Sequence, residues 1–394
     1  MTVATTMLLC ALGASFIGAI PFGYLVGRWR GVNIFEHGSG NLGATNVGRV
    51  LGRPFGFLVF ALDFLKGALP TLAALKFAEG SAIASELAGI AAGLGAFLGH
   101  LFPIYLKFKG GKGVATGAGV VAVLVPGAAV GAVLTWFVVV SITRYVSVAS
   151  MVAGLMLYHL HTTLANHAFA SSSLPLTCFC AVAATLVIVR HHTNLRRLIA
   201  GVEGHLKEKL TMGKLARIVH VVTLGFWFGG TAFFTFVATP IIFQSFEHLV
   251  ENQNSSRPEW MPAVTKLQAS QLSGIAVSHI FPWYFLLQGV CGLLALATTF
   301  RIGASKPFSR LEVWRLVILA AGVATILVAF PLSQKIETLR AARATGDEAA
   351  RAAFASWHLI SLLLNFVTVG LAGVALGMAA FLPPPSGRTE LAKT

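Results

Sequence analysis

The chain has 394 residues, of which 56% are hydrophobic and only 11% are charged, whereas about 25% are charged in an ordinary soluble domain. A water-soluble protein of this length could not bury so much apolar surface, so most of it must face lipid or other membrane helices. The formal net charge of +15 would fit nucleic-acid binding, but the basic residues lie in short segments between apolar runs, as in membrane proteins. The composition therefore excludes a soluble protein and argues against a nucleic-acid partner.

The cysteines and the N-terminus narrow the class further. Cys10, Cys178, Cys180 and Cys291 all lie in apolar stretches and form no C-x-x-C pair, which argues against a disulfide framework or a metal site. No basic residue precedes Arg28, so the N-terminus lacks the charged region of a cleavable signal peptide. We expect the first apolar stretch to be a retained membrane span.

Apolar runs recur along the whole chain, and an α-helix needs about 20 such residues to cross a bilayer. The sequence predicts an all-α polytopic membrane protein with about eleven spans, namely 3–27, 54–77, 83–105, 113–126, 127–143, 146–165, 174–190, 217–243, 274–300, 313–332 and 354–381. The fourth of these is short and Gly-rich, so we expect it to be tilted or partly broken.

Lysine and arginine predict the orientation. The segments 28–53, 106–112, 190–217 and 301–315 are basic, whereas the alternate segments are neutral or of mixed sign. The positive-inside rule therefore predicts an outside N-terminus and an inside C-terminus in a bacterial inner membrane.

A polar run divides the chain into two parts. Residues 204–214, GHLKEKLTMGK, form the longest polar run between apolar blocks, with seven predicted spans before it and four after it. We expect a seven-span domain at 1–205, a linker at 206–213, a four-span domain at 214–382 and a disordered tail at 383–394.

Three polar clusters fall on the predicted inner face. Residues 38–49 read GSGNLGATNVGR, where glycines let backbone N–H groups turn toward an anion and the polar side chains add donors. Residues 108–116 read FKGGKGVAT, which places two ammonium groups beside bare amides at a helix N-terminus and suits a phosphate. Residues 190–198 read RHHTNLRRL, and as a helix they would put His191, Asn194 and Arg197 on one face.

Each cluster also has a structural reading. The first can be a flexible loop, the second can reflect positive-inside charge, and the third can be a juxtamembrane basic patch. Inside the second span, Asp63 and Lys66 lie three residues apart, as a structural ion pair or as part of an active site. Taken together, the residues predict a phosphate-handling site at the inner membrane surface.

These clusters resemble the three signature motifs of a known enzyme family. Residues 38–49 with ALDFLKG at 61–67, residues 99–116 and residues 190–203 resemble the bacterial acyl-phosphate:glycerol-3-phosphate acyltransferase family, PlsY. Residues 143–150, TRYVSVAS, are similar to its linking segment, and the resemblance covers about residues 3–205. It implies a seven-span enzyme that moves a fatty acyl group from acyl phosphate to the 1-hydroxyl of sn-glycerol 3-phosphate. The products would be lysophosphatidic acid and phosphate, as in the first step of phospholipid synthesis, with no cofactor and no metal ion.

The resemblance also implies roles for individual residues. Contacts to glycerol phosphate would come from Ser39, Asn41, Thr45, Asn46 and Arg49. Contacts to the acyl phosphate would come from Lys109, Lys112 and Thr116 and from the amides of Gly110, Gly111 and Gly113. Arg144, Ser147 and Ser150 would lie nearby. Catalysis would rest on Lys112 with His191, Asn194 and Arg197. Asp63, Lys66, His100 and Glu203 would support the site without contacting substrate.

The chain departs from the family at Thr193, where the third motif usually has a glutamate. Without that carboxylate, the hydroxyl proton could pass to His191, to His192 or to the substrate's own phosphate. Acyl phosphate is already activated, so we expect positioning and charge neutralisation to dominate and the missing glutamate to be tolerated. The His-x-x-x-x-Asp mechanism of other glycerolipid acyltransferases is excluded, because neither Asp63 nor Asp347 has a histidine five residues earlier.

The second half resembles the small four-helix membrane family of unknown function typified by transmembrane-protein-205-like domains, beginning at residues 220–230, HVVTLGFWFGG. His220, His279 and His358 each start a predicted span, which leaves haem or metal ligation open beside interfacial or helix–helix hydrogen bonding. A scaffold or lipid-handling accessory domain is the conservative interpretation. Two alternatives for the whole chain stay open, an organophosphate transporter and a catalytically inactive acyltransferase-like module.

Overall fold

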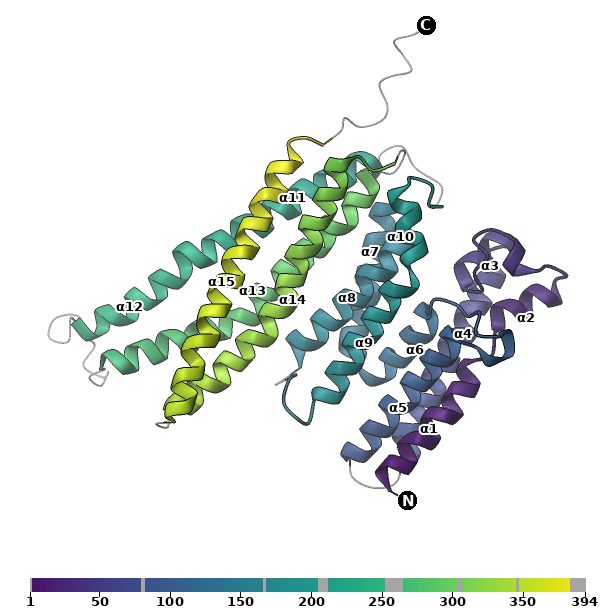
Figure 1. The fold of residues 1–394 in the computed structure, drawn as a ribbon, viewed down its shortest axis with the longest axis horizontal. Coiled ribbons are helices and arrows are strands. Elements are labelled where there is room, and N and C mark those ends of the chain that lie inside the picture. Colours follow the sequence, from purple (N-terminus) through teal and green to yellow (C-terminus); the bar gives the residue numbers. More distant parts are fainter. Residues whose placement is uncertain are drawn as a thin grey trace, which may run out of the picture. The chain divides into compact units, whose positions relative to one another are not determined.

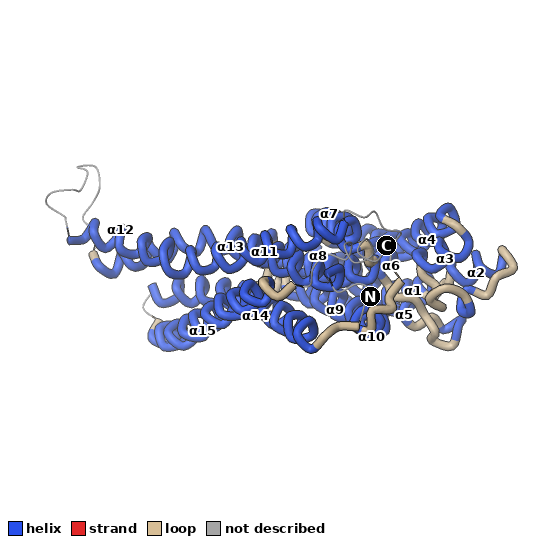
Figure 2. Tube along the Cα trace, turned by 90° about the horizontal axis from the view of Figure 1, so that it is seen from above, coloured by secondary structure: helices blue, strands red, loops and turns tan. Residues whose placement is uncertain are grey.

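The computed structural model describes residues 2–78, 82–165, 168–204, 212–251, 265–302, 307–344 and 347–382. Within these ranges the chain is helical, with short connecting loops and no strand (Figure 2). It divides into two compact units, with most residues up to Arg196 in the first and those from Arg197 in the second. The short segments Ser141–Arg144 and Thr162–Asn166 group with the second unit. The predicted tail and most of the predicted linker lie outside the described residues.

Up to residue 199, helices of very different length follow one another (Figure 1). The elements are α1 (Val3–Gly18), α2 (Phe22–Trp29), η1 (Ile34–Glu36), α3 (Ala44–Leu51), α4 (Arg53–Phe77), α5 (Ala82–Leu101), η2 (Ile104–Leu106), α6 (Val114–Leu124), α7 (Pro126–Thr143), α8 (Val146–Leu164), α9 (Leu174–Arg190) and α10 (His192–Ile199).

Small residues bring α1 and α5 together along their length (Figure 1). A Cβ on Gly18 would collide with the backbone of Ala96, and one on Gly99 would collide with the backbone of Ser15. In a membrane there is little hydrophobic driving force for helices to associate, so close backbone contact at small residues holds the two helices together. This pair fixes the end of α5 from which the predicted phosphate loop emerges.

The first predicted span is broken. Helix α1 ends at Gly18, and α2 starts at Phe22 after Pro21. Proline has no N–H to donate and disfavours a helical conformation of the residue before it, so the hydrogen-bond ladder stops there. The carbonyl of Ile20 accepts hydrogen bonds of 3.1 Å from the Phe22 N–H and 2.7 Å from Lys66 Nζ on α4, so the break is tied to the predicted site.

Helices α6 to α9 share an apolar core. Buried Val120, Ala129, Leu157 and Phe179 come from the four successive helices. Their mutual packing gives α9 a fixed surface to lie on, and α9 delivers the third polar cluster at its C-terminal end.

The prediction of an all-α polytopic membrane protein is confirmed, but the number of spans is lower than the eleven expected. In the described residues, eight helices are long and apolar enough to cross a membrane, or nine if α9 and α10, bent by 50°, count as one span. Helix α6 falls short because it has only 11 residues. Helix α8 is missing from this set because His159, His161 and neighbouring threonines lower its hydropathy.

The second unit contains the four expected long helical segments. They are α11 (Met212–Phe233) continued through a π-helical turn η3 (Phe234–Ala238) into α12 (Thr239–Glu251), then α13 (Lys266–Ile302), α14 (Arg310–Ala344) and α15 (Glu348–Ala379). Buried and partly buried polar side chains connect them. Tyr284 donates to the Asn365 amide oxygen at 2.9 Å, and Asn365 donates to Thr235 at 2.8 Å. Arg315, only 1% exposed, donates to the Met378 carbonyl near the end of α15.

The three histidines of the second unit differ in their surroundings. His220 is fully buried, with Nδ1 2.8 Å from Thr298 Oγ1 and 3.0 Å from the Ala295 carbonyl oxygen, so it links α11 to α13. His279 and His358 are exposed. Among the described residues, no three His, Cys, Asp or Glu side chains converge as metal ligands. His220 therefore makes a helix–helix hydrogen bond.

Candidate active site

The Lys-Gly-Gly-Lys loop at residues 109–112 is packed directly against the end of α5. The Gly111 N–H donates to the His100 carbonyl at 3.2 Å. A Cβ on Gly110 would collide with the backbone of His100 and Leu101, and one on Gly111 would collide with the His100 imidazole. The glycines are therefore required by close packing as well as by any ligand.

Arg190, the last residue of α9, holds the same loop from the other side. Its Nη2 donates to the carbonyls of Gly110 at 3.1 Å and Gly111 at 2.9 Å, and its Nε donates to Gly111 at 3.2 Å. The guanidinium carbon also lies 5.4 Å from the centre of the Phe102 ring. Sequence reasoning placed Arg190 in the third cluster but gave it no role, because nothing in the pattern points to backbone carbonyls about 80 residues earlier.

The second and third clusters meet through one side-chain contact. Lys112 Nζ donates to Asn194 Oδ1 at 2.5 Å, and Asn194 is buried. Buried His191 has its Nδ1 2.7 Å from the Val187 carbonyl. A carbonyl can only accept, so Nδ1 carries the hydrogen, and in the neutral ring Nε2 carries the lone pair. Of the predicted catalytic residues, Lys112 and Asn194 are therefore in direct contact, and His191 lies three residues before Asn194 in the chain.

The first cluster forms a turn that is organised by Asn46. The Asn46 amide oxygen accepts from the Ser39 N–H at 2.8 Å, and its NH₂ group donates to the carbonyls of Asn41 at 3.0 Å and His37 at 3.1 Å. Asn41 in turn accepts from the Gly43 N–H at 2.9 Å. The turn precedes α3 and presents Ser39 half-buried, with Thr45 exposed.

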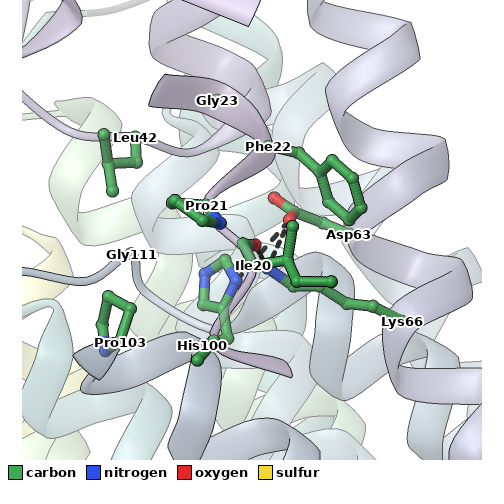
Figure 3. A pocket seen from close by; sticks show the side chains of 11 residues that line it. Ile20, Pro21, Phe22, Gly23, Leu42, Asp63, Lys66, His100, Pro103 and Gly111 are labelled. Carbon is green, nitrogen blue, oxygen red and sulfur yellow. Dashed lines mark hydrogen bonds and ion pairs between the residues drawn. The ribbon is translucent and has the colours of Figure 1, made fainter. Parts of the chain in front are cut away.

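Figure 3 shows a pocket whose lining includes a buried ionic group. Asp63 Oδ1 lies 2.8 Å from Lys66 Nζ and 3.7 Å from His100 Nδ1, and all three side chains are less than 8% exposed. Leu42 of the first cluster and Gly111 of the second line the same pocket. The ion pair satisfies the requirement that charges at membrane depth be paired, and it places two basic groups beside one carboxylate.

Four of the predicted contact groups are buried or have protein partners, and their contacts with substrate stay predictions. Asn46 is 2% exposed, and its amide makes hydrogen bonds that shape the turn. Thr116 is fully buried where α6 packs on α4 at Gly67. Ser150 is buried, donates to the Val146 carbonyl and accepts from Trp136, so it is a packing residue. The Gly111 N–H donates to the His100 carbonyl.

The remaining predicted contacts stay predictions. Lys109, Thr45 and Arg49 are exposed, and Ser147 is buried on α8. Arg144, at φ 66°, and the ion pair of Arg197 Nε with Glu203 Oε2 at 2.7 Å fall in the second unit.

Two family models match the chain. Residues 8–201 match the glycerol-3-phosphate acyltransferase model, and residues 222–345 match a domain of unknown function, DUF4149. The expected division into an acyltransferase-like half and a membrane domain without a known role thus coincides with two known families.

Curated relatives match the first half of the chain. The chain is 40% identical over 195 residues to a glycerol-3-phosphate acyltransferase from Trichlorobacter lovleyi, covering 50% of this chain and 95% of the relative. It is 40% identical over 191 residues to that of Aquifex aeolicus, covering 48% and 94%.

Solved structures include two crystal structures of PlsY (YgiH), described as an integral membrane glycerol 3-phosphate acyltransferase. The glycerol 3-phosphate form is 38% identical and covers 53% of this chain and 98% of that chain, with a TM-score of 0.47. The lysophosphatidic acid form is 37% identical and covers 51% and 95%, with a TM-score of 0.44. Given a near-complete match to curated relatives and a site built from three ordered motifs, residues 8–201 make this chain a member of the glycerol-3-phosphate acyltransferase family.

Proposed function

We propose that the first unit transfers a fatty acyl group from acyl phosphate to the 1-hydroxyl of sn-glycerol 3-phosphate and releases lysophosphatidic acid and phosphate. The observation that carries this proposal is the Lys112–Asn194 contact, which joins a lysine-rich glycine loop to a histidine-bearing helix end. Membership of the acyltransferase family supplies the reaction class. His100 of the buried Asp63–Lys66–His100 group accepts a hydrogen bond from the loop at Gly111.

The residues suit a reaction driven by positioning and charge. The hydroxyl oxygen attacks the acyl carbonyl carbon, the bond from that carbon to the phosphate oxygen breaks, and inorganic phosphate leaves. Lys112 neutralises charge on the phosphoryl group, and exposed Lys109 adds a second cation at its edge. The hydroxyl proton passes to His191 Nε2 or to a phosphate oxygen, both of which can accept it.

Thr193 does not prevent this chemistry. It is exposed at the start of α10, whereas buried Asn194 is the residue that contacts Lys112. A carboxylate at position 193 is therefore not needed to orient Lys112. We further propose that the site faces the cytoplasm of a bacterial cell, with an outside N-terminus, as the distribution of basic residues favours.

The test is acyl transfer by the purified full chain in detergent, from palmitoyl phosphate to labelled glycerol 3-phosphate, with an acyl-CoA donor in parallel. Labelled lysophosphatidic acid from acyl phosphate alone is the expected result. If neither donor gives product while glycerol 3-phosphate still binds, the proposal is wrong, and an inactive module or a transporter replaces it.

A further inference from the structure

The Arg190 side chain contacts the backbone of the Lys-Gly-Gly-Lys loop, and this contact has no assigned role. We propose that Arg190 is a positioning residue that holds the Lys-Gly-Gly-Lys loop in the orientation that receives the phosphate group of a substrate. The inference rests on the proposed function. Arg190 acts through the loop, with its three hydrogen bonds directed at the carbonyls of Gly110 and Gly111.

The direction of the peptide groups gives the physical reason. No cis peptide bond occurs in the described residues, so in this loop each C=O points away from the N–H of the following residue. Arg190 draws the Gly111 carbonyl toward itself, which turns the Lys112 N–H to the opposite side. The Gly110 carbonyl is drawn the same way, and the following Gly111 N–H reaches the His100 carbonyl.

This arrangement removes an electrostatic obstacle. Carbonyl oxygens carry partial negative charge and would repel a phosphate if they faced it. Arg190 turns two of them away and covers them with a cation. The Lys112 side chain is meanwhile fixed by Asn194, four residues after Arg190 and beyond the bend between α9 and α10. One helix end therefore fixes both the backbone and the lysine of the loop.

The role requires arginine and cannot be met by charge alone. A guanidinium is a planar fork that donates to two acceptors at once, whereas a lysine ammonium is a point charge. The Phe102 ring, 5.4 Å from the guanidinium carbon, limits the tilt of that plane. A lysine at position 190 would keep the charge and lose the paired hydrogen bonds.

The test compares Arg190→Gln and Arg190→Lys with Arg196→Gln, an exposed arginine at the same helix end. Glycerol 3-phosphate and palmitoyl phosphate are varied separately in acyl-transfer assays of the full chain. Both Arg190 variants are expected to raise KM roughly ten- to a hundredfold for the substrate whose phosphate the loop binds, with a much smaller change in KM for the other substrate. Arg196→Gln is expected to match the unmodified chain.

A milder variant and a structural measurement distinguish displacement of the loop from misfolding of the whole chain. Phe102→Leu is expected to raise the same KM several-fold, and trypsin is expected to cut after Lys109 or Lys112 faster in Arg190→Gln than in Arg196→Gln. Full activity of Arg190→Lys would overturn the proposal, as would equal rises in both KM values. If the unmodified chain makes no lysophosphatidic acid, the proposed function fails, and the trypsin comparison still decides whether Arg190 holds the loop.

Discussion

Lys112 Nζ and Asn194 Oδ1 lie 2.5 Å apart, although the two residues are 82 positions apart in the chain. An amide oxygen directs the ammonium group without cancelling its charge, whereas a carboxylate would form an ion pair and compete with a phosphate. The partner of this lysine is thus suited to anion binding, and this property leads to the first prediction.

Asn194→Asp is expected to lower kcat/KM for acyl transfer about a hundredfold, because the new carboxylate neutralises Lys112 in nearly the same shape. Lys112→Met should cause a loss of similar size, and the double variant should lose little more than either single variant, since both remove one function. Steady-state kinetics on the purified chain measure this. Lys107→Gln, an exposed lysine of the same loop, is the control. Unchanged activity of Asn194→Asp would contradict the charge argument.

Asp63→Asn is expected to destabilise the first unit by about 3–5 kcal/mol, because it leaves the buried Lys66 ammonium without its carboxylate. Adding Lys66→Met to this variant should recover part of the loss, since no buried charge then remains. Thermal unfolding in detergent, followed by circular dichroism, measures both variants. A double variant less stable than Asp63→Asn alone would show that the carboxylate does not compensate the lysine.

Gly18→Ala is expected to cost about 1–3 kcal/mol of stability, because the methyl group would collide with the Ala96 backbone and push α1 away from α5. Gly13→Ala on the same helix is the matched control. A Cβ there meets nothing within 4 Å, and the change should be neutral or slightly stabilising. The two melting temperatures in the same detergent decide the matter, and equal values would argue against tight α1–α5 packing.

Thr193→Glu restores the carboxylate that the third motif usually carries, and it is expected to change kcat by less than about threefold, well below the hundredfold or more of general-base catalysis. The reason is that Thr193 is exposed while Asn194 and His191 are buried. Thr193→Ala serves as the control for loss of the hydroxyl. A rise in kcat of tenfold or more in Thr193→Glu alone would mean that the carboxylate contributes to catalysis.

Much of the site was predictable because its motifs are local in sequence. Glycines beside lysines at 109–113 predicted an anion-binding loop, and the helical spacing of His191 and Asn194 predicted a shared helix end. The motifs predicted substrate contacts for Asn46, Thr116 and Ser150, and the structure shows that all three side chains are buried. A polar side chain in a motif can bind a ligand or form hydrogen bonds with the protein backbone, and only its burial and its partners distinguish these cases.

The sequence by itself determined the membrane character, the helical class, the two halves and the reaction family, because these depend on composition, apolar run length and contiguous motifs. The tertiary structure decided which groups meet. At the helix break beside Pro21, Lys66 donates a hydrogen bond to the Ile20 carbonyl. At the end of α9, Arg190 donates to the carbonyls of Gly110 and Gly111. Such contacts join residues tens of positions apart through helix packing, and no local pattern encodes the distance between them.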